Sequence, residues 1–385
     1  MSTFKVPITT IREINPHPSA DKLEIAKCYD YDVIIPKDIY EVGQIVVYVP
    51  VGSILSDELE SLLFPEDSKI KLTKNRIRAI KIRGVVSQGM ILDPEVFPKL
   101  KSKIEMNLQY GDTSFLETDA AEILGITKWM PPVADMPNLM NTSQVKNILK
   151  NLDFKQYTDV EHGKYYDRQV MTTGEEVIVT QKLHGTSARY GYFKRPVRSF
   201  MDKVKDYLGF LPAYEFCWGS RRCQISSRPD KKHVGFKSEE QGVDFGDVYT
   251  KITEQYNLKK LLPAGYAVYG EIVGWGIQKG YLYNCGKDKH AFYVYDVMKD
   301  GKYLNYDDAL AFCQKTGLVH VPLLYRGPYI MDNLLPLLKT NVISKEVNEG
   351  IVLKPVEDRS SPVMGRVLLK YINEDYLMRD NTEFQ

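Results

Sequence analysis

The sequence is poor in the features that mark secreted, metal-clustered or membrane-spanning proteins. Its five cysteines form no Cys-x-x-Cys pair, and their odd number argues against a disulfide framework or a thiolate zinc site. No apolar run reaches the roughly 18 residues of a membrane span, and no secretory signal opens the chain. We therefore expect an intracellular, cytoplasmic protein in a reducing compartment, with no membrane span and no membrane as a partner.

Net charge is also nearly absent, at +1, so any affinity for nucleic acid must come from local clusters of lysine and arginine. The content of 43% hydrophobic and 26% charged residues is that of an ordinary globular protein. At 385 residues the chain exceeds what one hydrophobic core usually serves. Two domains are the expectation.

Residues 1–115 are predicted to form the first domain. Strand-like segments at residues 4–12, 23–33, 44–49, 76–82 and 89–92 are separated by turns, a spacing typical of a small β-barrel. Residues 69–83, KIKLTKNRIRAIKIR, form a basic stripe without an acidic residue. The stripe suits phosphates, but a solvated strand edge protected from aggregation by its charge is an equal alternative. Its candidate nucleic-acid-binding residues are Lys74, Arg76, Arg78, Lys81 and Arg83.

Residues 116–160 are predicted to form a linker. Adjacent prolines at 131 and 132 resist both a helix and a central strand, and a helix is expected over residues 142–152. The second domain then covers residues 161–385.

The stretch VIVTQKLHGTSARYGY, residues 177–192, predicts a strand, a tight glycine turn and a second strand. It places Lys182 at a strand end. A lysine surrounded by cations or apolar walls has a lowered pKa and becomes a nucleophilic amine. The ordinary alternative is a surface lysine before a hairpin turn.

Further charged and aromatic residues follow at strand ends. They lie in EFCWGSRRCQISS (215–227), YAVYGEIVGWGIQKGY (266–281), HAFYVYDVM (290–298), NEGIVLKP (348–355) and GRVLLKYIN (365–373). Singly, each has an ordinary role in a salt bridge or in a core. In this order they supply what nucleotidyl transfer needs: cations for a triphosphate, carboxylates for a divalent metal and an aromatic ring for a base.

The series KLHGTS, GSR, GEIVGWGIQK, FYVYD, EGIVLKP and GRVLLK resembles motifs I, Ia, III, IIIa, IV and V of the covalent nucleotidyltransferases. Within them, Lys-x-His-Gly is similar to the nick-sealing RNA ligases, whereas DNA ligases and capping enzymes favour Lys-x-Asp-Gly. HPSADKLE (17–24) and IRGVVSQGMIL (82–92) resemble tRNA-binding OB-fold modules. An OB-like domain before the transferase resembles RNA ligases of the Deinococcus and Naegleria type. The resemblance implies an α+β protein, with an N-terminal OB-fold barrel and then an adenylylation domain of antiparallel sheets and helices.

The resemblance also implies roles for individual residues. Lys182 would attack the α-phosphate of ATP and hold AMP as a phosphoramidate. Glu271 and Glu349 would hold ribose hydroxyls and Mg²⁺ or Mn²⁺, and Tyr295 would stack on adenine. The other implied ATP contacts are Gln181, Leu183, Gly185, Ser187, Arg221, Lys354 and Lys370, with Arg221 and Lys370 also catalytic.

Two positions depart from the family pattern. Gln181 stands where family members often have a glutamate that faces the adenine, which leaves a strict preference for ATP less secure because an amide both donates and accepts. Lys370 is followed by Tyr371 and Ile372, so the second lysine of a Lys-x-Lys motif V is missing.

The implied function is an ATP-dependent RNA ligase that joins a 3′-hydroxyl RNA end to a 5′-phosphate end at nicks in a duplex. The reaction passes through lysyl-AMP and an adenylylated 5′-phosphate, and the partner is a nicked RNA or RNA/DNA duplex. Two alternatives remain at this point. One is a DNA ligase or capping guanylyltransferase, and the other is a nucleic-acid-binding module fused to an inactive transferase.

Overall fold

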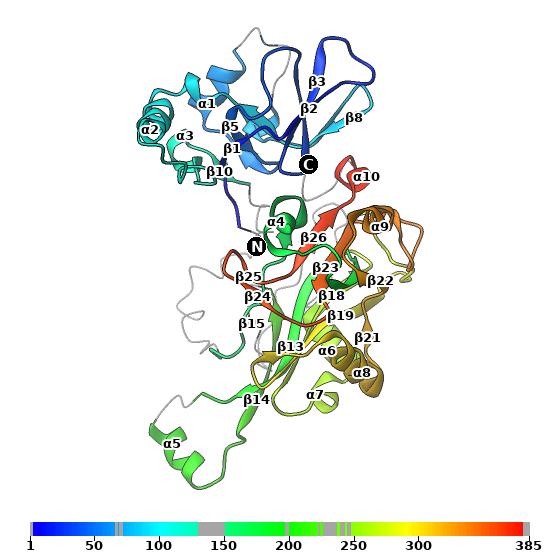
Figure 1. Cartoon of the computed structure of the whole chain (residues 1–385). Helices are drawn as coiled ribbons and strands as arrows, with labels where there is room; N and C mark the ends of the chain where they lie inside the picture. The colour runs from blue at the N-terminus through cyan, green and yellow to red at the C-terminus, as the bar shows by residue number, and fades with distance from the viewer. Residues whose placement is uncertain are drawn as a thin grey trace. The chain divides into compact units, whose positions relative to one another are not determined.

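The computed structural model describes residues 3–65, 68, 72–129, 151–196, 200–221, 224–225, 237–238, 243–244 and 248–379. The chain divides into two compact units (Figure 1). Of the described residues, the first unit holds 3–129, 161–168 and 372–379, and the second holds 151–160 and 169–371. The boundaries at residues 115 and 160 remain a prediction, and the expected helix at 142–152 lies, up to residue 150, outside the described residues.

The first unit is built from short antiparallel strands. Two sheets have the strand orders β1–β5–β9 and β2–β3–β4, and β7 pairs with β8 and β6 with β10. Its strands are β1 (Ile8–Thr10), β2 (Glu13–Pro16), β3 (Leu23–Cys28), β4 (Tyr31–Pro36), β5 (Ile45–Val49), β6 (Ser53–Ile54), β7 (Ile80–Ile82), β8 (Val85–Ser87), β9 (Met90–Leu92), β10 (Thr127–Lys128) and β11 (Glu161–His162). Its helices are α1 (Asp57–Leu63), η1 (Thr73–Asn75), η2 (Pro94–Val96), α2 (Pro98–Gln109), α3 (Ala121–Leu124) and α10 (Glu374–Leu377).

The single strand predicted over residues 23–33 is wrong, because the chain reverses within it. Strands β3 and β4 form a hairpin in which Cys28 pairs with Tyr31. Tyr29, at the turn, has a φ of 55°, which is uncommon for a bulky side chain. Its buried hydroxyl donates to Glu117 Oε2 at 2.6 Å. We infer that burial and this hydrogen bond stabilise a turn for which the local sequence carries no glycine signal.

Among the described residues, the second unit contains two large sheets, A and B, and two separate strand pairs, β16–β17 and β24–β25. Sheet A has the strand order β26–β23–β12–β22, and sheet B has the order β15–β14–β13–β18–β19–β20, with β21 beside β19. The strands are β12 (Glu176–Lys182), β13 (Thr186–Lys194), β14 (Tyr214–Ser220), β15 (Gln224–Ile225), β16 (Lys237–Ser238), β17 (Val243–Asp244), β18 (Tyr266–Gly274), β19 (His290–Lys299), β20 (Lys302–Tyr303), β21 (Val319–His320), β22 (Leu323–Pro328), β23 (Gly350–Pro355), β24 (Ser360–Ser361), β25 (Gly365–Arg366) and β26 (Leu369–Ile372). The helices are α5 (Phe200–Tyr207), α6 (Val248–Gln255), α7 (Leu258–Leu261), α8 (Tyr306–Thr316), α9 (Met331–Leu334) and η4 (Leu335–Lys339), and α4 (Gly163–Val170) carries the chain between the units.

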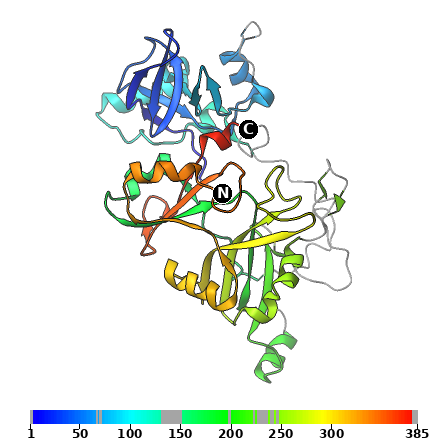
Figure 2. The ribbon, with the colours of Figure 1, turned by 90° about the vertical axis from the view of Figure 1, so that its right-hand side faces the viewer.

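Sheet B is buried on both faces. Figure 2 shows helices against one face, where side chains such as Tyr190, Ile272 and Phe292 pack on α6, α7 and α8. The other face contributes Tyr269 and Tyr295 to a second cluster that includes Val352 of sheet A. The polar side chains described next therefore lie between the two sheets. No helix among the described residues is long and apolar enough to cross a bilayer.

Candidate active site

Lys182 is the last residue of β12 and lies opposite Gly350, the first residue of β23. This register brings its side chain to the residue just before β23. The Nζ of Lys182 lies 2.5 Å from Oε1 of Glu349, whose side chain is only 3% exposed, against 24% for the lysine. The structure thus joins two of the predicted site residues in an ion pair with a reachable amine.

Gly185 occupies a place that a larger residue cannot. A Cβ atom there would collide with the carbonyl oxygen of Ile272 and would lie 2.9 Å from Glu271 Cγ. The backbone N–H of Gly185 donates to Glu271 Oε1 at 3.2 Å. The glycine of the Lys-x-His-Gly motif therefore lets the turn after β12 close directly against β18, and it orients Glu271.

Ser187 and Glu271 are directly opposite each other on β13 and β18, so both side chains lie on the same face of sheet B. Tyr295 joins them through a bulge. The partner of Tyr269 is Asp296, while the partner of Gly270 is Val294, which leaves Tyr295 as the extra residue of β19. Bulges re-aim side chains, and here the Tyr295 hydroxyl lies 2.8 Å from Ser187 Oγ. Three predicted site residues are thereby brought together. Burial, and next the nearby Glu271 charge, raise the pKa of Tyr295, so it is a neutral phenol.

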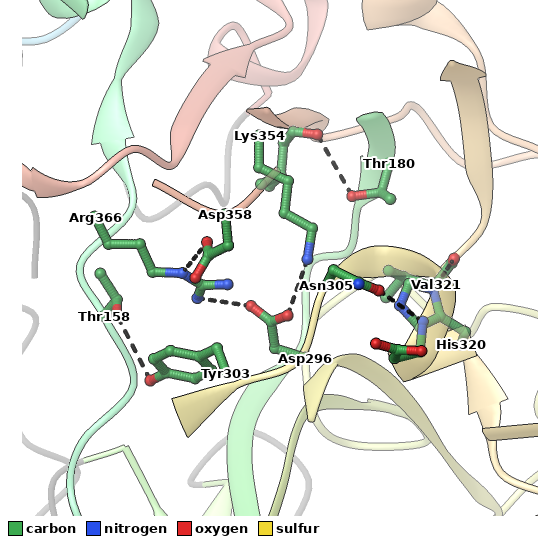
Figure 3. Close-up of polar contacts among 12 residues, drawn as sticks. Thr158, Thr180, Asp296, Tyr303, Asn305, His320, Val321, Lys354, Asp358 and Arg366 are labelled. Carbon is green, nitrogen blue, oxygen red and sulfur yellow. Dashed lines mark hydrogen bonds and ion pairs between the residues drawn. The ribbon is translucent and has the colours of Figure 1, made fainter. Parts of the chain in front are cut away.

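A fully buried carboxylate, Asp296, connects the two sheets (Figure 3). It accepts hydrogen bonds from Lys354 Nζ at 2.9 Å, from Arg366 at 2.8 Å and from the Tyr157 hydroxyl at 2.6 Å. Burial alone disfavours its charge, but the attraction of Lys354 and Arg366 outweighs that effect and lowers the pKa of Asp296 to about 2. Arg366 also contacts Asp358 at 2.7 Å and lies over the ring of Tyr303.

The predicted phosphate-binding lysines differ in their surroundings. Lys354 lies on the same face of sheet A as Lys182, four residue pairs along, but it is buried and paired with Asp296. The charge of Lys354 is therefore compensated within the protein. Lys370 lies on β26, next to β23, and is half-buried. The phosphate contacts of both lysines remain a prediction.

Gln181 and Leu183 flank the nucleophile in the chain and are both buried. Along a strand, neighbouring side chains point to opposite faces, so Gln181 lies on the other face of sheet A from Lys182. Its Nε2 donates to Asn341 Oδ1 at 2.8 Å, and its Oε1 accepts from the N–H of Val342 at 3.1 Å. Both ends of this amide are engaged by the loop at residues 341–346.

Arg221 follows the end of β14 and forms an ion pair with Asp159. Ala188 of β13 pairs with Ser220 of β14. Ser187 comes just before Ala188 and Arg221 just after Ser220, so Arg221 lies near the end of sheet B where Ser187 and Tyr295 meet. Its charge also acts on Tyr295. Arg222, beside it in the sequence, lies outside the described residues.

The basic stripe is not a uniform exposed edge. Lys81 and Arg83 are exposed on the hairpin of β7 and β8, where Arg83 and Gly84 both have positive φ, and Lys74 is exposed in η1. Arg76 is buried, with its guanidinium 3.6 Å from the centre of the Trp129 ring. Burial, and then repulsion from Arg78, lower the pKa of Arg76 to about 10. The half-buried Arg78 lies between these extremes, and nucleic-acid binding by the stripe remains a prediction.

A divalent metal would find a small donor set. Among the described residues no three of His, Cys, Asp and Glu come together as a metal cluster. Within the same residues, Glu349 Oε2 is buried and has no hydrogen-bond partner. An oxygen of this kind, on a carboxylate, suits a hard cation such as Mg²⁺ or Mn²⁺. The site therefore fits an ion that takes its remaining ligands from substrate and water.

Several residues at the site were missed from the sequence. The Tyr283 hydroxyl accepts from the N–H of His184 at 2.7 Å, and Gln278 Nε2 donates to the carbonyl of Gly185 at 3.0 Å. Gln278, Asp296 and Arg366 stand inside segments that the motifs already cover, so their polar character next to buried strands was the available signal. Tyr157 lies outside these segments, and its partner Asp296 is 139 residues away.

A family model described as RNA ligase matches residues 175–372, and a model described as an OB-fold domain matches residues 5–94. No curated protein matches. Three similar solved structures are point mutants of the Naegleria gruberi RNA ligase, each 22% identical with a TM-score of 0.69. The apo form covers 98% of both chains, the form with ATP and Mn covers 97% of this chain and 98% of that one, and the form with AMP and Mn covers 97% of each. The predicted α+β fold, with an OB-fold domain ahead of the transferase, is thereby confirmed.

Proposed function

This chain belongs to the RNA ligase family, and on that basis we propose that it uses ATP to join a 3′-hydroxyl RNA end to a 5′-phosphate end at a nick in a duplex. Lys182 is the proposed nucleophile. A reducing, cytoplasmic setting is part of the proposal, on the sequence ground that five cysteines include no paired motif.

The observation that carries the proposal is the position of Lys182. Its amine stands at a strand end, 24% exposed, against a nearly buried carboxylate, as a reachable nucleophile needs. Around it the chain supplies Glu271, held by the Gly185 N–H, and the aromatic ring of Tyr295. ATP and Mn in the Naegleria structures support the choice of nucleotide and metal.

The first chemical step is attack by the Lys182 amine on the α-phosphate of ATP. The amine must first lose a proton, and Glu349 Oε1, at 2.5 Å, is placed to receive it. An N–P bond forms as the bond to pyrophosphate breaks, which leaves AMP on the lysine. A metal at Glu349 and Glu271 would supply positive charge that offsets the phosphate charges.

In the second step an oxygen of the RNA 5′-phosphate attacks the same phosphorus. The N–P bond breaks, Lys182 leaves as an amine, and a 5′–5′ pyrophosphate forms. The 3′-hydroxyl then attacks the 5′-phosphate, a phosphodiester forms, and AMP leaves. Through these steps Tyr295 would keep the base in place by stacking, while Arg221 and Lys370 would contact phosphate oxygens and stabilise developing charge. Because Lys354 is bound to Asp296, we assign it mainly to positioning β23, the strand that begins directly after Glu349.

The experiment that tests the proposal is label transfer. Wild-type protein with α-labelled ATP should give a labelled band, and Lys182→Ala should abolish it because no other side chain there replaces the amine. The same variant should still seal a nick that was adenylylated beforehand, though slowly. Label transfer from GTP in place of ATP would indicate a capping enzyme, and substantial labelling of Lys182→Ala would refute the assignment of the nucleophile.

A further inference from the structure

Helix α5 (Phe200–Tyr207) presents an apolar surface to solvent far from the proposed active site. It lies at the tip of the hairpin formed by β13 and β14, and both views show it projecting beyond sheet B (Figures 1 and 2). Ser187 and Lys194 are seven positions apart along β13, so they lie on the order of 23 Å apart at the rise of a strand. The helix therefore serves something other than the nucleotide.

The exposed apolar side chains are large and adjacent. Phe200 is 77% exposed, Tyr207 is 91% exposed and Phe210, just after the helix, is 74% exposed. The remaining members are Met201, Val204 and Leu208. At 3.6 residues per turn, the apolar side chains within residues 200–208 fall on one arc of about 120° of the helical wheel. Large exposed apolar patches mark interaction sites.

Charges are arranged around this arc in a definite order. On the helical wheel Lys203 and Lys205 border the arc on its two sides, and Asp202 and Asp206 occupy the opposite face. The aspartate face is turned toward the chain itself. Asp202 lies 3.9 Å from Arg195, and both aspartates border a hollow with Lys194 and Tyr214. The helix thus directs its acidic face to the protein and its apolar face, edged by lysines, outward.

We propose that this surface, formed by α5 and Phe210, docks on a lipid bilayer that contains anionic phospholipid. An apolar face flanked by lysines is the pattern of helices that lie in the membrane interface, where lysine stems bury and their ammonium groups reach the phosphates. Nucleic acid would satisfy the lysines and leave the apolar arc uncovered. A second copy would bring lysines against lysines at both edges of the contact. A bilayer satisfies both features and requires no matching groove.

The test is flotation of the full-length protein with phosphatidylcholine vesicles, with and without phosphatidylglycerol. The triple variant Phe200→Gln, Val204→Gln and Leu208→Gln keeps good helix formers and should weaken binding to the anionic vesicles at least about tenfold. A matched control replaces Leu62, Met106 and Leu108, which are exposed on helices of the first unit, by glutamine and should bind like wild type. Lys203→Gln with Lys205→Gln should remove the preference for anionic over neutral vesicles.

Equal vesicle binding by wild type and the triple variant would overturn the proposal, because it would assign the affinity to the basic stripe of the first unit. Failure of wild type to bind would overturn it as well. Light scattering measures the molar mass in solution as a third test. A wild-type dimer that becomes a monomer in the triple variant would make this face a contact between copies and would refute lipid docking. Unchanged circular dichroism spectra of all variants keep each result interpretable.

Discussion

Asp296 is the residue whose replacement should cost the second unit most. The substitution Asp296→Asn keeps the size of the side chain and removes its charge. It leaves Lys354 and Arg366 buried beside a neutral amide, since both cations form ion pairs with the carboxylate. Breaking a buried ion pair from one side costs about 3–5 kcal/mol, and the lower end applies because asparagine can still accept a hydrogen bond.

The lowered pKa of Asp296 gives a second, independent value for how much its charge stabilises the folded state. An ordinary aspartate has a pKa of 3.8 and Asp296 has one of about 2, so its ionisation stabilises the folded state by about 2 kcal/mol at neutral pH. Because the folded pKa is the lower one, this stabilisation is present above pH 4 and is lost as the pH falls toward 2. In the Asp296→Asn variant, the free energy of unfolding should therefore lack this contribution to its decrease between pH 4 and pH 2.

Urea unfolding followed by circular dichroism measures both effects. The matched control is Asp307→Asn. Asp307 forms an exposed ion pair with Arg326 through two hydrogen bonds, at 2.7 and 3.0 Å, and its replacement should change the free energy of unfolding little. Lys354→Met on the Asp296→Asn background should cost less than on the wild type, because the lysine has already lost its partner. A loss no larger than that of Asp307→Asn would refute the view that this network holds the two sheets together.

Three further predictions concern the site and the stripe. Glu271→Ala should lose self-adenylylation that added manganese does not fully restore, and full rescue by manganese would remove Glu271 from the metal site. Tyr295→Phe loses the 2.8 Å contact to Ser187, about 1 kcal/mol, and should be mild in ATP labelling, whereas Tyr295→Ala should be severe. Equal losses would indicate a role for the hydroxyl. The exposed members of the basic stripe are Lys74, Lys81 and Arg83. Neutralising all three should weaken binding to nicked duplex and lower the salt dependence of that binding by about one unit of slope per lost phosphate contact. Unchanged binding would mean that the stripe is a solvated edge.

The sequence predicted most of the second unit because its motifs coincide with strand ends. Glycine and alternating apolar residues fixed the turn at Gly185 and the strands on either side, and the register then brought Lys182 to Glu349 and Ser187 to Glu271. The first unit was less accessible. The turn at Tyr29 depends on a hydrogen bond to Glu117, 88 residues away, and no local pattern carries that information.

The electrostatic character of the site was the harder part to foresee. A sequence reveals that Lys354 is a lysine but not that it is buried on a carboxylate of the facing sheet. Arg76 likewise counts as a positive charge in the stripe, yet in the fold it lies against Trp129. Both cases depend on pairings between segments more than 50 residues apart, which composition and periodicity do not encode.

Gln181 offers the last test, because sequence and structure lead to different expectations for it. As the residue before the nucleophile it was expected to influence the preference for ATP. In the fold its amide bonds Asn341 and Val342, and Asn341 Oδ1 also accepts from the N–H groups of Ile343 and Ser344. Gln181→Glu would replace the donor with an acceptor that faces Asn341 Oδ1.

An amide flip of Asn341 would not relieve this conflict, because it would break the contacts that Asn341 Nδ2 makes to Ser344 and Glu346. Gln181→Glu should therefore destabilise the second unit by about 1–3 kcal/mol in urea unfolding. The ratio of labelling by ATP to labelling by GTP should stay as in wild type, since the side chain is on the other face of sheet A from Lys182. A stable variant with a tenfold change in that ratio would show instead that Gln181 contacts the base.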